Sequence, residues 1–137
     1  MYGAALAAGF AHSLVLCPTV APKTHVFGLN TSGQLGLGGT DPQLAQIVIG
    51  GPLTPFTGST FIAAGNAHSF LIKGGIAYGF GSNALGQLGW SGKPLQTTPH
   101  PVPNLTGVLA VSCGADFTLF LVVDGGDGTD TMEPPVS

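Results

Sequence analysis

The sequence predicts an all-β fold built from short antiparallel strands. Glycine and proline supply 23 and 11 of the 137 residues and separate many short apolar runs. Closely spaced turn residues between such runs are typical of sheets. No stretch of the sequence shows the 3.6-residue apolar period of a sizeable helix. Two blocks of residues also recur in the same order along the chain, which indicates a repeated structural unit.

The first recurring block begins with an Ala-x-Gly turn and continues into an apolar run. Its copies lie at residues 7–16, 63–72 and, in degraded form, 112–121. The glycines and histidines that mark the first two copies are Gly9, His12, Gly65 and His68. Phe117 takes the place of the histidine in the third copy. Because buried polar side chains normally find hydrogen-bond partners, we expect each histidine to anchor the turn of its repeat unit.

The second recurring block has the pattern Gly-x-Asn-x-x-Gly-Gln-Leu-Gly. It follows the first block twice, at residues 28–36 and 81–89. The glycines that mark its end are Gly33, Gly36, Gly86 and Gly89. So many glycines do not suit the interior of a strand or helix, and they predict a compact loop with positive φ angles.

Each repeat unit is expected to hold four short strands. For the second unit we expect them at residues 60–64, 69–72 and 76–80 and near residues 100–103. The pair Gly74-Gly75 supplies the positive φ of a tight hairpin between two of them. The unit recurs after 56 residues, measured between the histidines, and a four-stranded unit of this length is typical of a propeller blade.

The two blocks resemble the repeat of the regulator of chromosome condensation family, whose unit carries both. The resemblance covers residues 4–123 and implies a partial β-propeller, about two and a half antiparallel blades of seven. The units span residues 4–56 and 57–107, with an incomplete unit at 108–123. Such an arrangement leaves open strand edges. We therefore expect a fragment of a longer chain, a module completed by a partner, or a piece that associates with itself.

An acidic tail with glycine and proline fills residues 124–137 and is expected to be disordered. Within it, residues 125–133 match the calcium-binding nonapeptide Gly-Gly-x-Gly-x-Asp-x-apolar-x. In that motif successive turns share each ion, so a single copy cannot build a full site.

Charge and composition narrow the range of partners. The chain has three Lys and Arg residues and a net charge of −3, so it has no basic face for nucleic acid. No apolar run approaches the roughly 18 residues of a membrane span. The cysteines, Cys17 and Cys113, form no Cys-x-x-Cys pair and are expected to be reduced thiols. Reduced thiols favour an intracellular setting, in the cytoplasm or the nucleus.

No arrangement of residues indicates catalysis, a cofactor or a metal. A zinc site would have to draw its ligands from His12, His25, His68, His100, Cys17 and Cys113. Their spacing matches no metal-binding signature. Neither the Gly-x-Ser-x-Gly nucleophile pattern nor the phosphate-binding loop pattern occurs. We expect a protein that is not an enzyme.

The family resemblance implies a scaffold whose faces contact proteins. We expect a protein-interaction module whose contact residues lie in turns and loops: Phe10, Asn66, Trp90 and Asp116. Trp90 takes the place of Leu37 and is expected to pack in its loop, or to anchor a partner if it is exposed. Some family members are guanine-nucleotide exchange factors, so exchange on a Ran-type small GTPase is the alternative.

Overall fold

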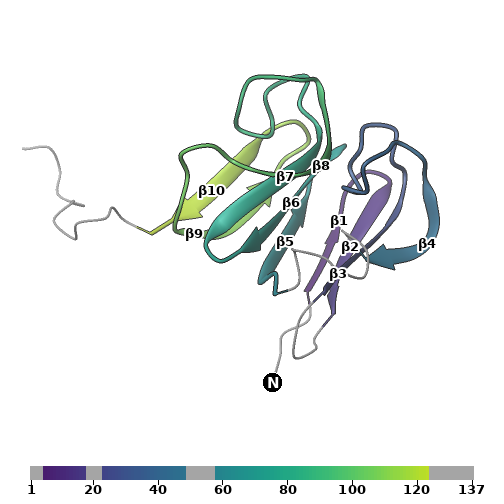
Figure 1. The fold of residues 1–137 in the computed structure, drawn as a ribbon, viewed down its shortest axis with the longest axis horizontal. Coiled ribbons are helices and arrows are strands. Elements are labelled where there is room, and N and C mark those ends of the chain that lie inside the picture. Colours follow the sequence, from purple (N-terminus) through teal and green to yellow (C-terminus); the bar gives the residue numbers. More distant parts are fainter. Residues whose placement is uncertain (1–4, 18–22, 49–57, 124–137) are drawn as a thin grey trace, which may run out of the picture.

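The computed structural model describes residues 5–17, 23–48 and 58–123, which form strands, turns and loops. Two four-stranded antiparallel sheets and a two-stranded hairpin stand side by side (Figure 1). This architecture confirms the partial propeller that the repeats predict. No helix long and apolar enough to cross a membrane is found in the described ranges.

Blade 1 is the first sheet, with strand order β1-β2-β3-β4. Its strands are β1 (Ala5–Ala8), β2 (His12–Cys17), β3 (Lys23–Gly28) and β4 (Gln43–Val48). Along β2 buried and half-buried side chains alternate, because successive side chains point to opposite faces of a sheet. His12 and Leu14 therefore lie on the same buried face.

Blade 2 repeats this order as β5-β6-β7-β8. Its strands are β5 (Phe61–Ala64), β6 (His68–Lys73), β7 (Ile76–Ser82) and β8 (Leu95–Pro101). The turn between β6 and β7 is formed by Gly74 and Gly75, with φ angles of +61° and +76°. All but the last residue of β6 is buried, because this strand has a neighbouring blade on each side.

The last strand of blade 2 begins earlier than the sequence predicts. It was expected near residues 100–103, whereas β8 covers Leu95–Pro101. The prolines Pro99 and Pro101 argue against a strand interior, but β8 is the outer edge strand, where a missing N–H is tolerated. Its pairing with β7 is also interrupted by a register shift between Gly79 and Gly81.

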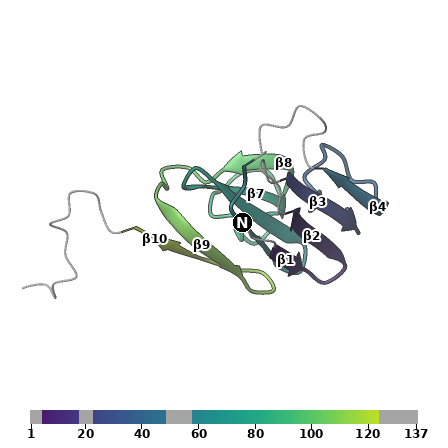
Figure 2. The same cartoon turned by 90° about the horizontal axis from the view of Figure 1, so that it is seen from below.

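The third unit consists of the antiparallel hairpin of β9 (Val108–Cys113) and β10 (Thr118–Val122). Figure 2 shows this hairpin at one end of the molecule and β4 at the other. The first strands of the three units are neighbours, since β1 contacts β5 and β5 contacts β9. The tail at 124–137, with its calcium-type nonapeptide, lies outside the described residues.

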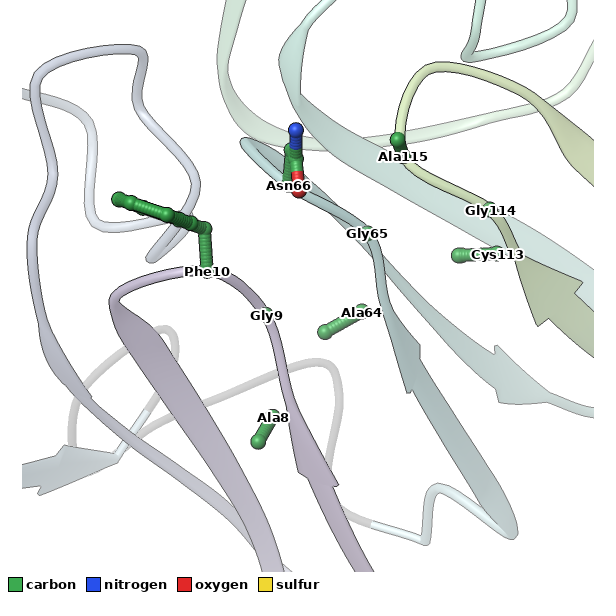
Figure 3. Close-up of a pocket in the computed structure, with 9 residues that line it drawn as sticks. All are labelled: Ala8, Gly9, Phe10, Ala64, Gly65, Asn66, Cys113, Gly114 and Ala115. Atoms are coloured by element: carbon green, nitrogen blue, oxygen red, sulfur yellow. The ribbon is translucent and has the colours of Figure 1, made fainter.

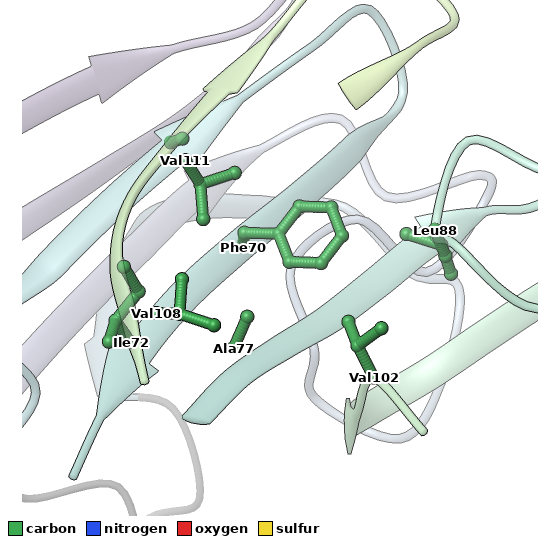
Figure 4. Packing of buried hydrophobic residues seen from close by; sticks show 8 residues of the cluster. Phe70, Ile72, Ala77, Leu88, Val102, Val108 and Val111 are labelled. Carbon is green, nitrogen blue, oxygen red and sulfur yellow. The ribbon is translucent and has the colours of Figure 1, made fainter. Parts of the chain in front are cut away.

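The hydrophobic core lies between blades rather than within one sheet. The first cluster joins the two four-stranded blades and contains Leu14, Leu16, Val26, Leu35, Ile62, Leu71 and Phe80. The second joins blade 2 to the third unit and contains Ala63, Phe70, Ile72, Ala77, Leu88, Val102, Val108 and Val111 (Figure 4). Each interface buries the face that a single sheet would leave open.

Candidate interaction surface

The histidine of the first block joins blade 1 to blade 2. His12 Nε2 lies 2.8 Å from the Oγ of Ser69 on β6. The Ser69 hydroxyl donates to the carbonyl oxygen of Gln34, back in blade 1, at 2.8 Å. Because the hydroxyl has a single proton, it must accept from the imidazole, so the proton of His12 resides on Nε2. We call this chain of two hydrogen bonds a histidine joint.

The same joint recurs between blade 2 and the third unit. His68 Nε2 lies 2.9 Å from Thr118 Oγ1, which donates to the carbonyl oxygen of Gln87 at 2.7 Å. Both imidazoles therefore bond to a hydroxyl of the next blade. The sequence alone does not identify these hydroxyl partners. The turns that carry the imidazoles are closed by the main chain, as where the N–H of Gly9 donates to the carbonyl of His12 at 2.9 Å.

Burial keeps the histidine side chain of each joint neutral. It lowers the pKa of His12 from 6.5 to about 4, with a further contribution from the charge of His68. Burial also lowers the pKa of His68. A side chain at Gly9 or Gly65 would overlap the imidazole three residues later, so close packing requires glycine at both positions. The signature of the first block is thus explained by one packed turn.

The second block forms a self-contained loop in each blade. Asn30 accepts from the N–H of Leu35 at 2.9 Å and donates to main-chain carbonyls nine and eleven residues later, both at 3.0 Å. Asn83 likewise accepts from the N–H of Leu88 at 3.1 Å and donates to the carbonyl of Trp90 at 2.8 Å. The signature glycines with positive φ are Gly33, Gly36, Gly86 and Gly89. These loops therefore use their polar groups for their own structure.

The described residues give no support for metal or thiol chemistry. Among them, no three His, Cys, Asp or Glu side chains lie close enough to hold a metal ion. Cys17 and Cys113 are both free. Burial raises the pKa of Cys113 to about 12, so this thiol stays protonated at neutral pH.

Three turns align at one end of the blades and form what we call the turn face, made of Phe10, Asn66, Ala115 and Asp116. The N–H of Phe10 donates to the carbonyl of Asn66 at 3.4 Å, and the N–H of Asn66 to that of Ala115 at 3.1 Å. Between the turns lies a hollow of about 310 Å³, lined mainly by glycine and alanine (Figure 3). Phe10 is 81% exposed, and Asn66 and Asp116 are exposed as well.

Trp90 lies apart from the turn face. It packs half-buried against the second core cluster, and its ring centroid lies 5.0 Å from that of His100 on the outer strand β8. Leu37, its counterpart in blade 1, packs in the same way against the first cluster. The structure thus brings together three of the four residues expected at the surface and places the fourth in its loop.

Blades with recurring loops and recurring inter-blade joints define a β-propeller repeat protein. The family model described as "Regulator of chromosome condensation (RCC1) repeat" matches residues 74–121. With both repeat blocks present twice, the chain belongs to the RCC1 repeat family.

Relatives share these repeats over most of the chain. The human probable E3 ubiquitin-protein ligase HERC4 is 35% identical over 129 residues, which is 88% of this chain and 11% of HERC4. The RCC2 homolog of Xenopus laevis is 33% identical over 121 residues, 84% of this chain and 22% of that protein. The chain therefore spans a small part of the relatives it matches.

Solved propellers share the fold at low sequence identity. Prp20p from Saccharomyces cerevisiae, described with its binding to Gsp1p and histones, has a TM-score of 0.72 and 22% identity. The match covers 93% of this chain and 32% of Prp20p. Human WBSCR16 gives a TM-score of 0.74 at 20% identity, over 86% of this chain and 30% of its own. These likenesses establish the fold alone.

Proposed function

We propose that the chain is a protein-interaction scaffold of RCC1-type repeats that contacts its partner through the turn face. The observation that carries the proposal is the combination of a fixed frame with variable side chains. Phe10, Asn66 and Ala115 hold the same place in three successive turns and are linked by main-chain hydrogen bonds. Their side chains nevertheless differ completely in chemistry, as expected for loops that carry recognition.

Phe10 is the central contact residue of this proposal. Its ring is 81% exposed beside a hollow lined by small residues, although a buried position would be more favourable for it. Exposed aromatic side chains are frequent anchors in protein interfaces. Asn66 and Asp116 add polar groups around this apolar anchor, giving the usual arrangement of an interface centre and its rim.

The relatives share with this chain only the part of their length that holds the repeats. The HERC proteins are named as ligases, but this chain matches only 11% of HERC4. We accordingly propose binding, and no catalytic step, for the segment in hand. We also propose that the chain lies inside the cell, where its two free cysteines stay reduced.

Site-specific crosslinking tests the turn face. A photoreactive phenylalanine analogue is placed at position 10 in one variant and at position 44 in another, and crosslinked proteins are identified by mass spectrometry. Leu44 on β4 is fully exposed and serves as the matched control. We expect a discrete partner from position 10 only, with at least tenfold weaker binding after Phe10→Ala. Equal crosslinking at both positions, or unchanged binding of Phe10→Ala, would contradict the proposal.

Guanine-nucleotide exchange is the second candidate, suggested by the shared fold with Prp20p and that protein's described binding to Gsp1p. Exchange requires no acid, base or nucleophile, because the exchange factor wedges open the nucleotide site of the GTPase. Adding this chain to a Ran-type GTPase loaded with fluorescent nucleotide separates the two candidates. Accelerated release would favour exchange, and binding without release would favour the scaffold.

A further inference from the structure

The two outer turns of the turn face differ in the chemistry that they expose. In blade 1 the exposed side chains are apolar, since Phe10 is 81% exposed and Leu29, beside the turn face, is 38% exposed. The N–H of Leu29 donates to the carbonyl of Ala11 at 2.8 Å, which holds this loop residue next to the turn. In the third unit the exposed group is the carboxylate of Asp116. The turn face therefore runs from an apolar side to an acidic side.

Blade 2 separates these two sides with neutral polar groups. Asn66 is exposed in the middle turn, between Phe10 and Ala115 (Figure 3). The N–H of Ser82 donates to the carbonyl of Ala67 at 2.8 Å, which adds a hydroxyl beside that turn. The three turns are hydrogen-bonded in series, at N···O distances of 3.4 and 3.1 Å. Because hydrogen-bonded neighbouring chains lie about 5 Å apart, the main chains of the two outer turns are separated by roughly 10 Å.

Asp116 has no basic partner within the part of the chain that the structure describes. Lys23 and Lys73 lie at the β2–β3 and β6–β7 hairpins, at the strand ends opposite to the turn face. Lys93 lies in the loop before β8 and forms no ion pair with this carboxylate. The charge of Asp116 acts on the imidazole of His68, but burial lowers the pKa of that histidine and keeps it neutral. The carboxylate is thus available to a cation from another molecule.

We propose that the partner of the turn face is an extended protein segment that presents an apolar side chain to Phe10 and Leu29 and a basic side chain to Asp116. This inference rests on the proposed function and adds the chemistry and the direction of the bound segment. An extended chain advances about 3.3 Å per residue, so the two side chains stand about three residues apart. The hollow lined by glycine and alanine receives the aliphatic stem of the basic side chain, while its charged head reaches the carboxylate. An acidic segment would be repelled at the same place.

Selection from a peptide display library measures this preference without a known partner. Random short peptides are selected on the immobilised native chain and, in parallel, on Asp116→Asn. Peptides from the native chain should carry a basic residue about three positions from an apolar one, and those from Asp116→Asn should lack the basic preference. Asp41→Asn is the matched control, because it removes one exposed carboxylate from the second-block loop of blade 1 and leaves the turn face unchanged. It should select the same peptides as the native chain.

Exchanging the charges tests the pairing directly. A selected peptide should bind Asp116→Lys about fivefold or more weakly than it binds the native chain, since an attraction becomes a repulsion. The same peptide with glutamate in place of its basic residue should bind Asp116→Lys more tightly than it binds the native chain. Fluorescence anisotropy gives the dissociation constants, and thermal unfolding verifies that each variant is folded.

The outcomes separate this inference from the proposed function. Phe10→Ala shows whether the selected peptides use the turn face at all. Peptides that need Phe10 but show no basic preference, or that bind Asp116→Lys as tightly as the native chain, overturn the inference and leave the turn face as the binding site. A selection in which no peptide depends on Phe10 contradicts the proposed function and the inference together.

Discussion

At the scale of single residues, the histidine joint is the feature that explains the most conspicuous part of the repeat. One imidazole, one hydroxyl and one carbonyl connect two blades at distances between 2.7 and 2.9 Å. The hydroxyl accepts one bond and donates the other, so the joint requires a proton on the histidine Nε2. The other nitrogen, Nδ1, is buried in both joints and has no partner among the described residues, which makes protonation there costly.

Stability should accordingly fall on acidification. The unfolded chain protonates His12 near pH 6.5, whereas the folded chain does so only near pH 4. Between these values the unfolded state binds more protons, so the free energy of unfolding decreases as the pH falls from 7 to 4, by a loss on the order of 3 kcal/mol for this residue. Urea unfolding of the native chain and of His12→Asn should show a smaller pH dependence in the variant. Identical pH dependence would contradict the assignment.

A second residue-scale prediction concerns Gln34, whose Nε2 is buried without a partner among the described residues. In blade 2 the equivalent Gln87 donates to Ser82 Oγ at 3.3 Å, but Leu29 replaces that serine in blade 1. Leu29→Ser should therefore be about 1 kcal/mol more stable than Leu29→Ala, because only serine can accept from Gln34. Urea unfolding of both variants measures the difference, and equal stabilities would contradict the explanation.

At the scale of elements, the loops of the second block act as fixed corners between β3 and β4 and between β7 and β8. One asparagine in each loop bonds to main-chain groups that lie five to eleven residues later in the chain. In blade 2 one of these groups is the carbonyl of Trp90, whose ring packs on the second core cluster. The main chain that carries the indole is thus held by the Asn83 side chain.

Asn83→Ala should release Trp90 and cost about 2 kcal/mol, since one buried and one partly buried hydrogen bond are lost. The chain has one tryptophan, so its emission should shift to the red and become more accessible to iodide. Asn30→Ala removes the matching bonds in blade 1, far from the indole in sequence, and should destabilise the chain without changing the native spectrum. A red shift in Asn30→Ala, or none in Asn83→Ala, would contradict this explanation.

The repeat predicted most elements, and the exceptions have physical reasons. Strands β5, β6 and β7 lie within two residues of their predicted bounds, because glycine turns mark their ends. The start of β8 was missed because proline at an edge strand looks like a loop. For the candidate site, aligning the copies places Phe10 and Asn66 together. It cannot show that His12 bonds to Ser69, since that pairing depends on how two blades face each other in space.

At the scale of the whole molecule, stability depends on interfaces between neighbouring units. Each unit buries its core against the next, as in other repeat proteins, where stability is close to a sum over units and their interfaces. The joints thus hold the frame on which the variable turn face is displayed.

A double-mutant cycle on the free energy of unfolding tests this claim most directly, using His12→Ala, Ser69→Ala and the double variant, alongside His68→Ala, Thr118→Ala and their double variant. We predict a coupling of about 1–2 kcal/mol in each cycle, because each pair shares one buried hydrogen bond. The cross pair His12 and Thr118, which belong to different joints, should be additive. Additive effects within both joints would contradict the account, because the blades would then be held together by apolar packing alone.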